Sequence, residues 1–478
     1  MSFWSPDTVR SVVGGAWVTR PNTRTTDLFG VTIDSRKVRP GQVFVALAGA
    51  RTDGHRFVEH AARGGCPLAI VERVDGPLPP DIGIIRVVST VEALGRLASA
   101  YRRSAPSLRV VAVTGSCGKT TTVRLIDAVL SQRLRGSASP KSFNNEIGVP
   151  LTLLNARPSD NYVVCEVGTN APGEIDTLAR MCEPDVGVIT CIGRAHLEGL
   201  GGLEGVAAEK ASLLAHLRAT GYAFVPSPKE CPLLQPHLRA LDRERMVTIG
   251  VGPEADLRVT DVRTSETGVC FSLNDRVRFE TSLLGAHNAI NAAIAIGVGR
   301  RLGLRDEEIR AGLRAVHAEE MRGQLLHVGP VKVINDAYNA NPDSMLAGLR
   351  TLADWSGPRR VAVLGDMLEL GPAAAEEHRL VGEWLGASRA VDLVVLVGEL
   401  ARHALQPAAS GLGADRVHFF EKLDDESGPA IARLFEPGDV ILLKASRRIG
   451  LERLVAEIER RFVPDVTSAA PDRTSALS

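Results

Sequence analysis

The sequence predicts an α/β protein that is built from three successive domains. Its 478 residues exceed what one hydrophobic core usually organises, and 44% of them are hydrophobic, which is ample for globular folding. Short apolar runs alternate with helical patterns along the chain, as expected for parallel sheets that are covered by helices. We expect domains over 1–106, 107–318 and 319–463, and a disordered tail over 464–478, which is rich in Pro, Ser, Ala and Thr.

The composition argues against several classes of protein. The chain has 56 Lys plus Arg and 56 Asp plus Glu residues, so its formal net charge is zero. A chain without net charge has no overall positive potential that would attract nucleic acid or an anionic membrane. No apolar run approaches the roughly 20 residues of a membrane span, and residues 1–10 lack the apolar core of a secretory signal. The seven cysteines show no C-x-x-C spacing, which is typical of reduced thiols in the cytoplasm. We therefore expect a cytoplasmic protein without membrane insertion and without a nucleic-acid partner.

The first domain is expected to hold a small sheet. Apolar runs predict strands over 43–47, 68–71 and 84–88, and a helix is expected over 56–62. Ser35 and Arg36 follow an aspartate in a turn that precedes these strands. They either bind a phosphate group or cap and pair locally, and the sequence alone leaves both interpretations open.

The second domain begins with the pattern of a phosphate-binding loop. Residues 110–113 predict a buried strand, and Lys119 and Thr120 open a helix that runs to about Leu130. In such loops glycines let the backbone approach an anion, helix N–H groups point at it, lysine reaches the outer phosphates and threonine holds Mg²⁺. A chance glycine-rich turn is the alternative, because Val113 stands where the usual motif has its first glycine. The candidate nucleotide-binding residues are Gly115, Ser116, Cys117, Gly118, Lys119, Thr120 and Thr121.

Two polar residues follow the next apolar strands of this domain. Glu166 lies near the end of a strand expected over 162–168, and a carboxylate there is costly to bury without a partner. A metal ion is one such partner, and a salt bridge at the rim of the sheet is the alternative. His196 lies in the loop after a strand expected over 185–193, where α/β sheets gather their ligands. The alternative for His196 is a solvated loop histidine.

Polar residues also occur in the helical and loop segments around these strands. The loop over 142–150 contains Asn144 and Asn145, whose side chains commonly form turns and caps. Residues 204–217 predict a helix, on which Lys210 is by default an ordinary surface lysine.

The end of the second domain is less regular. Residues 226–284 are expected to form short strands within an insertion. An apolar helix then begins near Gly285, and His287 and Asn288 at its start either cap the helix or face an adenine.

The third domain repeats the alternation of strands and helices. Its strand ends are rich in Asp, Asn, Lys and Arg, which marks one edge of the sheet as functional. Strands are expected over 331–336, 360–364, 392–397 and 440–443, and the loop over 338–344 leaves the first of them.

Taken together, these motifs resemble those of the Mur ligase family of peptidoglycan synthesis, over nearly the whole chain except the tail. General family features are D-S-R, D-G-H, T-G-x-x-G-K-T-T, I-G-x-A-H-L-E and G-x-H-N. More specific are N-N-E-I-G-V-P over 144–150, D-A-Y-N-A-N-P over 336–342 and L-G-D-M-L-E-L-G over 364–371. These three indicate the branch of the family that adds D-alanyl-D-alanine.

The resemblance implies an ATP-dependent amide ligase that also needs Mg²⁺. It would join D-alanyl-D-alanine to UDP-N-acetylmuramoyl-tripeptide through an acyl phosphate, as a monomer. A small UDP-binding domain would precede a central P-loop parallel-sheet ATPase domain and a C-terminal Rossmann-like domain. Two rivals remain: an amide ligase for another substrate, such as folate with glutamate, and a P-loop switch protein that forms no amide.

The resemblance also implies roles for individual residues. Lys119, Glu166, His196 and Lys210 would be catalytic. Thr120, Glu166, His196 and Lys210 would hold metal, with Lys210 carbamylated. Asn288 would contact adenine, Asp336 the ribose, and Arg322 would reach the nucleotide from the third domain once the domains close. The substrate-binding residues would be Ser35, Arg36, Asn144, Asn145, Asn339 and Asn341.

Overall fold

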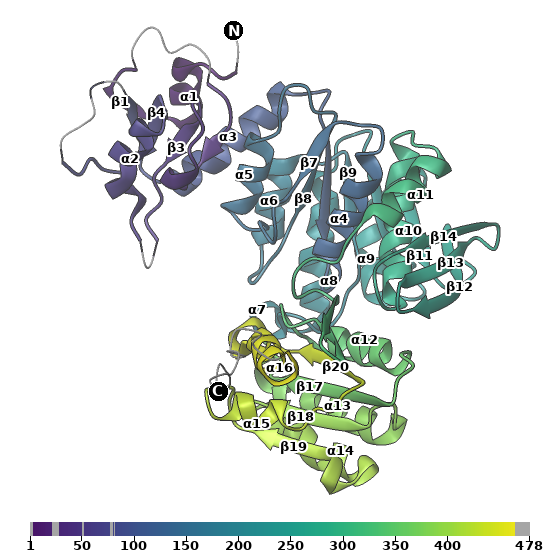
Figure 1. Cartoon of the computed structure of the whole chain (residues 1–478). Helices are drawn as coiled ribbons and strands as arrows, with labels where there is room; N and C mark the ends of the chain where they lie inside the picture. Colours follow the sequence, from purple (N-terminus) through teal and green to yellow (C-terminus); the bar gives the residue numbers. More distant parts are fainter. Residues whose placement is uncertain (1–2, 22–27, 50–51, 77–79, 81, 464–478) are drawn as a thin grey trace, which may run out of the picture.

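The computed structural model describes residues 3–21, 28–49, 52–76, 80 and 82–463, so the predicted disorder of the tail over 464–478 lies outside the described residues. Within the described chain, three α/β units follow one another, each built on one sheet of five, nine or six strands (Figure 1). The α/β class with three domains is therefore confirmed. No helix among the described residues is long and apolar enough to cross a membrane.

The N-terminal unit is a five-stranded sheet in the order β1-β5-β4-β3-β2, parallel except for β1. Its central strands form because their apolar side chains are buried on both faces. The elements are β1 (Ala16–Thr19), β2 (Val31–Thr32), β3 (Val43–Val45), β4 (Leu68–Val71), β5 (Gly83–Arg86), α1 (Pro6–Val13), α2 (Val58–Arg63) and α3 (Thr90–Ser104). Leu97 of α3 shares one hydrophobic core with Leu153 of the central unit, which joins the two units.

The central unit is a nine-stranded sheet in the order β14-β13-β12-β11-β10-β9-β6-β8-β7. The predicted strand before the phosphate loop is β6, and it lies between β9 and β8 in parallel register. The strands are β6 (Arg109–Thr114), β7 (Gly136–Ala138), β8 (Tyr162–Glu166), β9 (Val186–Ile189), β10 (Tyr222–Pro226), β11 (Met246–Gly250), β12 (Leu257–Ser265), β13 (Gly268–Leu273) and β14 (Val277–Thr281). The helices are α4 (Lys119–Leu130), α5 (Gly148–Leu154), α6 (Glu174–Cys182), α7 (Leu197–Leu200), α8 (Leu203–Ala211), α9 (Gln235–Leu238), α10 (His287–Arg301) and α11 (Asp306–Ala315).

The prediction of an insertion over 226–284 is wrong, because this segment continues the central sheet. β10 and β11 extend the parallel order beyond β9, and β12, β13 and β14 then add an antiparallel edge. Side chains along β12 alternate between inward and exposed positions, so the strand has no continuous apolar run. That alternation is why the sequence pattern understated the extent of the sheet.

The C-terminal unit is a six-stranded sheet in the order β15-β16-β20-β17-β18-β19. The four predicted strands are parallel neighbours, and two strands that the sequence analysis did not identify, β15 and β19, form the edges. The elements are β15 (Gln324–Val328), β16 (Val331–Asn335), β17 (Arg359–Gly365), β18 (Leu393–Val397), β19 (Val417–Phe420), β20 (Asp439–Lys444), α12 (Pro342–Ala353), α13 (Ala374–Ser388), α14 (Leu405–Leu412), α15 (Ser427–Ala432) and α16 (Leu454–Phe462). In Figure 1, α12 and β20 lie toward the central unit, near α7 and α8.

Candidate active site

The phosphate loop connects β6 to α4, and its geometry requires glycine at two positions. Gly115 has φ +150°, and a Cβ atom there would lie 1.8 Å from Thr190 Oγ1. Gly118 has φ +77°, and a Cβ atom there would lie 2.8 Å from Asn291 Oδ1. Lys119 folds back so that its Nζ donates to the Gly115 carbonyl at 2.7 Å. The loop therefore has the close backbone approach that anion binding needs.

A cavity of about 1170 Å³ opens over this loop and is bounded by both the central and the C-terminal units. It brings together most of the predicted site residues. Those that line it are Ser116, Cys117, Gly118, Lys119, Thr120, Thr121, Asn144, Asn145, Glu166, His196, Asn288, Arg322, Asp336, Asn339 and Asn341. Gly115 and Lys210 lie outside this lining, as do Ser35 and Arg36 of the N-terminal unit.

Glu166 is almost completely buried at the end of β8, beside the phosphate loop. Thr120 Oγ1 donates to its Oε2 at 2.7 Å, and Asn144 Nδ2 donates to its Oε1 at 2.9 Å. In the described chain no Lys, Arg or His nitrogen lies within 4.0 Å of this carboxylate, so the alternative of a rim salt bridge is not what forms. A buried carboxylate beside a hydroxyl, without a cationic partner, fits the oxygen donor set of Mg²⁺.

His196 also lines the cavity, and the carboxylate that it contacts belongs to the C-terminal unit. Its Nδ1 lies 2.7 Å from Oε2 of Glu369, in the C-terminal unit. Among the described residues there is no cluster of three or more His, Cys, Asp or Glu side chains that could hold a metal ion. The joint role of Glu166 and His196 at a metal therefore stays a prediction.

Lys210 is not a surface residue, so that default expectation is wrong. Its side chain, on α8, is only 1% exposed. Burial lowers the pKa of the Lys210 ammonium to about 7, and the charge of Lys119 adds to this effect. The described chain offers it no carboxylate within ion-pairing distance. With this pKa, a substantial fraction of the Lys210 side chain is a neutral amine near neutral pH.

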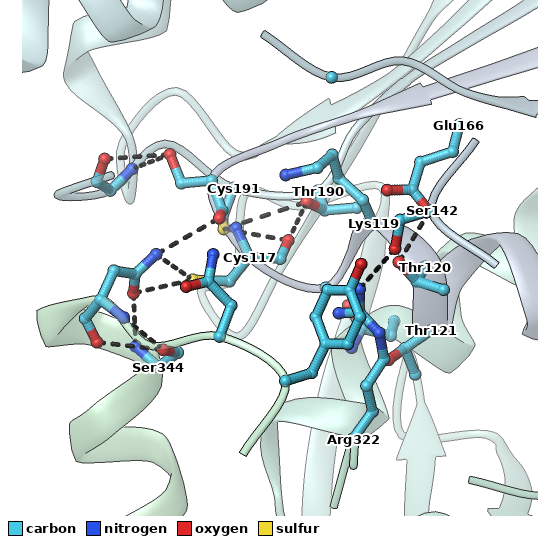
Figure 2. Close-up of a pocket in the computed structure, with 18 of the residues that line it drawn as sticks. Cys117, Lys119, Thr120, Thr121, Ser142, Glu166, Thr190, Cys191, Arg322 and Ser344 are labelled. Atoms are coloured by element: carbon cyan, nitrogen blue, oxygen red, sulfur yellow. Dashed lines mark hydrogen bonds between the residues drawn. The ribbon is translucent and has the colours of Figure 1, made fainter. Parts of the chain in front are cut away.

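Two cysteines lie beside the phosphate loop. The Cys117 N–H donates to Cys191 Sγ at 3.3 Å (Figure 2), and the neighbouring side chain of Cys117 lowers the pKa of the Cys191 thiol. All seven cysteines are free. Cys117 belongs to the predicted nucleotide-binding loop, whereas no sequence motif pointed to Cys191.

The C-terminal unit also contacts the central unit through Arg322. Its guanidinium donates to Ser142 Oγ at 2.9 Å (Figure 2). The same group stacks on the Tyr338 ring, 3.9 Å from the ring centre. Asp336 pairs with Lys444, whose Nζ lies 2.5 Å from Oδ2. The buried ammonium of Lys444 therefore fixes the carboxylate of Asp336 at the cavity wall.

Asn341 connects the two units directly. Its Nδ2 donates to the Ser116 carbonyl at 3.4 Å and to Cys117 Sγ at 3.2 Å. Its Oδ1 also accepts from the Ser344 N–H at 2.9 Å and so caps α12. Asn339 lies two residues earlier, in the loop before α12, and its carbonyl accepts from Lys444 at 3.3 Å.

The other asparagines form short-range hydrogen bonds at the cavity wall. Asn288 Nδ2 donates to the Leu284 carbonyl at 2.7 Å, and Asn145 Oδ1 accepts from the Gly148 N–H at 3.0 Å. Of the two residues in the turn of the N-terminal unit, Ser35 is buried and Arg36 pairs locally. The Arg36 guanidinium bonds both oxygens of Asp34 at 2.9 Å and holds the pKa of that carboxyl at about 2.

An ion-pair cluster between the units was missed by the sequence analysis. The guanidinium of Arg194 lies 2.7 Å from Asp343 and 2.8 Å from Glu377, and the Arg194 N–H also donates to Asp343. Arg194 precedes His196 by two residues, within the I-G-x-A-H-L-E motif. Its position in that motif was the only available signal, because its partners lie far away in the sequence.

Models of three Mur ligase domains match the chain in order. The Mur ligase family catalytic domain matches residues 28–102, the Mur ligase middle domain residues 113–299, and the Mur ligase glutamate ligase domain residues 321–447. A solved structure of MurF from Acinetobacter baumannii is similar with a TM-score of 0.82 at 31% identity, over 96% of this chain and 99% of that one. MurF ligase from Thermotoga maritima in complex with ADP is similar with a TM-score of 0.74 at 28% identity, over 91% and 98%.

Curated relatives extend over almost the full length of both proteins. The UDP-N-acetylmuramoyl-tripeptide–D-alanyl-D-alanine ligase of Bacillus subtilis is 36% identical over 442 residues, which is 92% of this chain and 94% of the relative. The ligase of the same name from Escherichia coli is 34% identical over 90% of this chain and 94% of the relative. With this identity and coverage, and with the phosphate loop in a cavity shared between two units, the chain belongs to the Mur ligase family.

Proposed function

We propose that this protein is the ATP-dependent ligase that joins D-alanyl-D-alanine to UDP-N-acetylmuramoyl-tripeptide in peptidoglycan precursor synthesis. One observation carries the proposal: the phosphate loop and the D-A-Y-N-A-N-P segment over 336–342 line one cavity. The segment was the more specific part of the resemblance, and relatives of that name match about nine-tenths of the chain. By this activity the protein would support cell-wall growth, cell shape and cell division.

The three domains would divide the substrates between them. Residues 1–106 would bind the UDP moiety, with Ser35 and Arg36 near it, residues 107–318 would bind ATP, and residues 319–463 would complete the site. Asn288, Arg322 and Asp336 would contact the nucleotide. Asn144, Asn145, Asn339 and Asn341 would lie near the peptide substrates.

The first chemical step makes the peptide carboxylate reactive. A carboxylate oxygen attacks the γ-phosphorus of ATP, the bond from this phosphorus to the bridging oxygen breaks, and ADP leaves. Positioning and charge neutralisation supply most of the catalysis in such transfers. Lys119, whose Nζ lies over the loop, and Arg322, which reaches in from the C-terminal domain, would hold the phosphate oxygens.

The second step forms the amide. The amine nitrogen of D-alanyl-D-alanine attacks the carbonyl carbon of the acyl phosphate, the carbon–oxygen bond to phosphate breaks, and the nitrogen loses a proton. Water would destroy the acyl phosphate, so the site must exclude it. Arg194, which pairs with Asp343, and Asn341, which bonds the phosphate loop, tie the C-terminal domain to the central domain and would keep the cavity closed during this step.

Mg²⁺ would be held by Thr120 and Glu166, with His196 at a second position. When bound, the ion neutralises phosphate charge during transfer. We also propose that Lys210 carries a carbamate, as the family resemblance implies. Its deprotonated amine would add to CO₂ and release a proton, which replaces a buried cation with an anionic oxygen donor beside the site.

The compartment and the oligomeric state are further parts of the proposal. Seven free thiols, several of them buried, are consistent with the reducing cytoplasm. One chain supplies residues on every side of the cavity, so a monomer would suffice for the reaction.

Phosphate release tests the proposed function. ADP and phosphate should form only when ATP, Mg²⁺, UDP-N-acetylmuramoyl-tripeptide and D-alanyl-D-alanine are all present. A parallel mixture with folate and glutamate should give no turnover. ATP hydrolysis at the same rate with and without the UDP-linked peptide would instead support a P-loop switch protein. Turnover only with folate and glutamate would contradict the proposal.

Replacement of Arg322 tests whether the C-terminal domain acts on the nucleotide. Arg322→Ala removes a guanidinium whose charge-assisted contacts are worth about 1.5–3 kcal/mol. We expect kcat/KM for ATP to fall by roughly tenfold or more, because both the charge and the contact across the domains are lost. Arg416→Ala, at an exposed position in the turn just before the edge strand β19, serves as the control. Unchanged kinetics in Arg322→Ala would contradict the closure argument.

A further inference from the structure

The L-G-D-M-L-E-L-G segment over 364–371 has no role in the function described above, yet the structure holds it rigidly. It begins with the last two residues of β17, and the side chains of Met367 and Leu370 are buried in the core of the C-terminal domain. Because the loop is already fixed, its exposed side chain, Glu369, can contact another domain at little further cost in conformational entropy. The hydrogen bonds that fix it run from the Ala401 N–H to Asp366 Oδ1 at 2.8 Å, from the Met367 N–H to His378 Nε2 at 2.9 Å, and from the Leu368 N–H to Ser446 Oγ at 2.9 Å.

The side chain that this loop presents is Glu369, and it meets His196 of the central domain. Oε2 of Glu369 lies 2.7 Å from Nδ1 of His196. Both residues have left-handed backbones, with φ of +64° for Glu369 and +56° for His196. Such conformations are uncommon for non-glycine residues and gather at functional sites. The contact across the domain interface therefore joins two residues that both hold an uncommon backbone conformation.

The backbones of the two loops also touch. The Glu198 N–H donates to the Glu369 carbonyl at 3.4 Å. Gly371 has φ +55°, and a Cβ atom there would lie 3.2 Å from the Cβ of Glu198. Glycine at 371 therefore lets the two loops approach closely enough for the carboxylate to reach the imidazole.

We propose that Glu369 is a positioning residue that accepts a hydrogen bond from Nδ1–H of His196 and so leaves the Nε2 lone pair free for a divalent cation. A histidine that ligates a metal generally donates its other N–H to such a partner, which fixes its tautomer and orientation. The inference deepens the proposed function and rests on it. Because the two residues belong to different domains, His196 is ready to bind the ion only when the C-terminal domain has docked. ATP use is thereby linked to closure.

Docking of the domains does not depend on this pair alone. Arg194 pairs with Asp343 and Glu377, and Asn341 bonds the phosphate loop. Removal of the Glu369 carboxylate should therefore disturb His196 while the interface stays formed. Glu376 offers a matched control, because it lies seven residues later and, among the residues that the structure describes, pairs only with Arg379 on the surface.

The tautomer of His196 can be measured directly, without substrates. Nitrogen-15 NMR of the full-length protein labelled at histidine, at about pH 8, distinguishes the two neutral forms, and His196→Gln assigns the signal. We expect the Nδ1–H form in the unmodified protein and in Glu376→Gln, and mainly the Nε2–H form in Glu369→Ala. Glu369→Gln keeps an acceptor oxygen and should retain much of the Nδ1–H form. An Nε2–H form in the unmodified protein, or no change in Glu369→Ala, would overturn the proposal.

Binding of Mn²⁺ in the presence of ADP gives the second readout. Glu369→Ala should weaken Mn²⁺ binding by about tenfold, whereas Glu376→Gln should bind as the unmodified protein does. In a His196→Gln background, Glu369→Ala should have no further effect. A further tenfold loss there would mean that Glu369 only docks the domains, and the proposal would be wrong. Neither readout requires D-alanyl-D-alanine, so a failed ligase assay is distinguishable from a failure of this inference.

Discussion

Replacement of Lys119 by alanine is expected to lower kcat/KM about ten- to two-hundredfold. The ammonium lies over the phosphate loop and would carry charge-assisted contacts to ATP worth about 1.5–3 kcal/mol. Part of this stabilisation grows as charge moves during phosphoryl transfer, so kcat should fall as well as affinity. Steady-state phosphate release with all substrates measures both quantities.

Two controls separate this effect from damage to the loop. Lys119 Nζ donates to the Gly115 carbonyl, so its loss could also loosen the turn. Lys119→Arg retains the charge and should keep the thermal unfolding midpoint of the parent protein, while its different shape still lowers kcat. Lys422→Ala removes a lysine whose side chain is 77% exposed and should behave as the parent does. A Lys119→Ala enzyme with parental kinetics would show that the loop does not bind ATP phosphates.

The elements that local patterns define were predictable from the sequence. The phosphate loop depends on glycines and on a strand and a helix that adjoin it, so β6 and α4 form where the pattern placed them. Edge strands were not predictable in the same way. The side chains of β15 are mostly half-buried, and this mixed pattern does not distinguish a strand from a loop.

Long-range pairing explains what the sequence could not reveal about the site. Arg194 is separated from Asp343 by 149 residues and from Glu377 by 183, and no local pattern links them. Asn144 looked like a turn residue, yet its amide holds Glu166, because the loop after β7 folds over the end of β8. The burial of Lys210 likewise follows from the way α8 packs, since nothing in its neighbouring residues distinguishes it from a solvated lysine.

Replacement of Lys210 by alanine is expected to abolish nearly all activity. The Lys210 ammonium is 1% exposed and has no ion-pairing carboxylate in the described part of the chain, so it is costly to keep charged, and its pKa is lowered to about 7. The neutral amine can take up CO₂, with formation of a nitrogen–carbon bond and release of a proton. The resulting carbamate would add the oxygen donors that a second Mg²⁺ needs near the peptide carboxylate. Added acetate or formate should partly restore Lys210→Ala, because either can occupy the vacated space.

Lys210→Met distinguishes the carbamate from a merely buried lysine. Methionine fills a similar volume without charge, so a structural lysine predicts an active protein that is at least as stable as the parent. The carbamate predicts a stable but inactive protein, in which carboxylic acids give no rescue because the space is filled. Carbon-13 NMR with labelled bicarbonate should show a carbamate signal in the parent that is absent from Lys210→Met. Electron density that ends at Nζ of Lys210, in a crystal with both metal ions bound, would refute the carbamate.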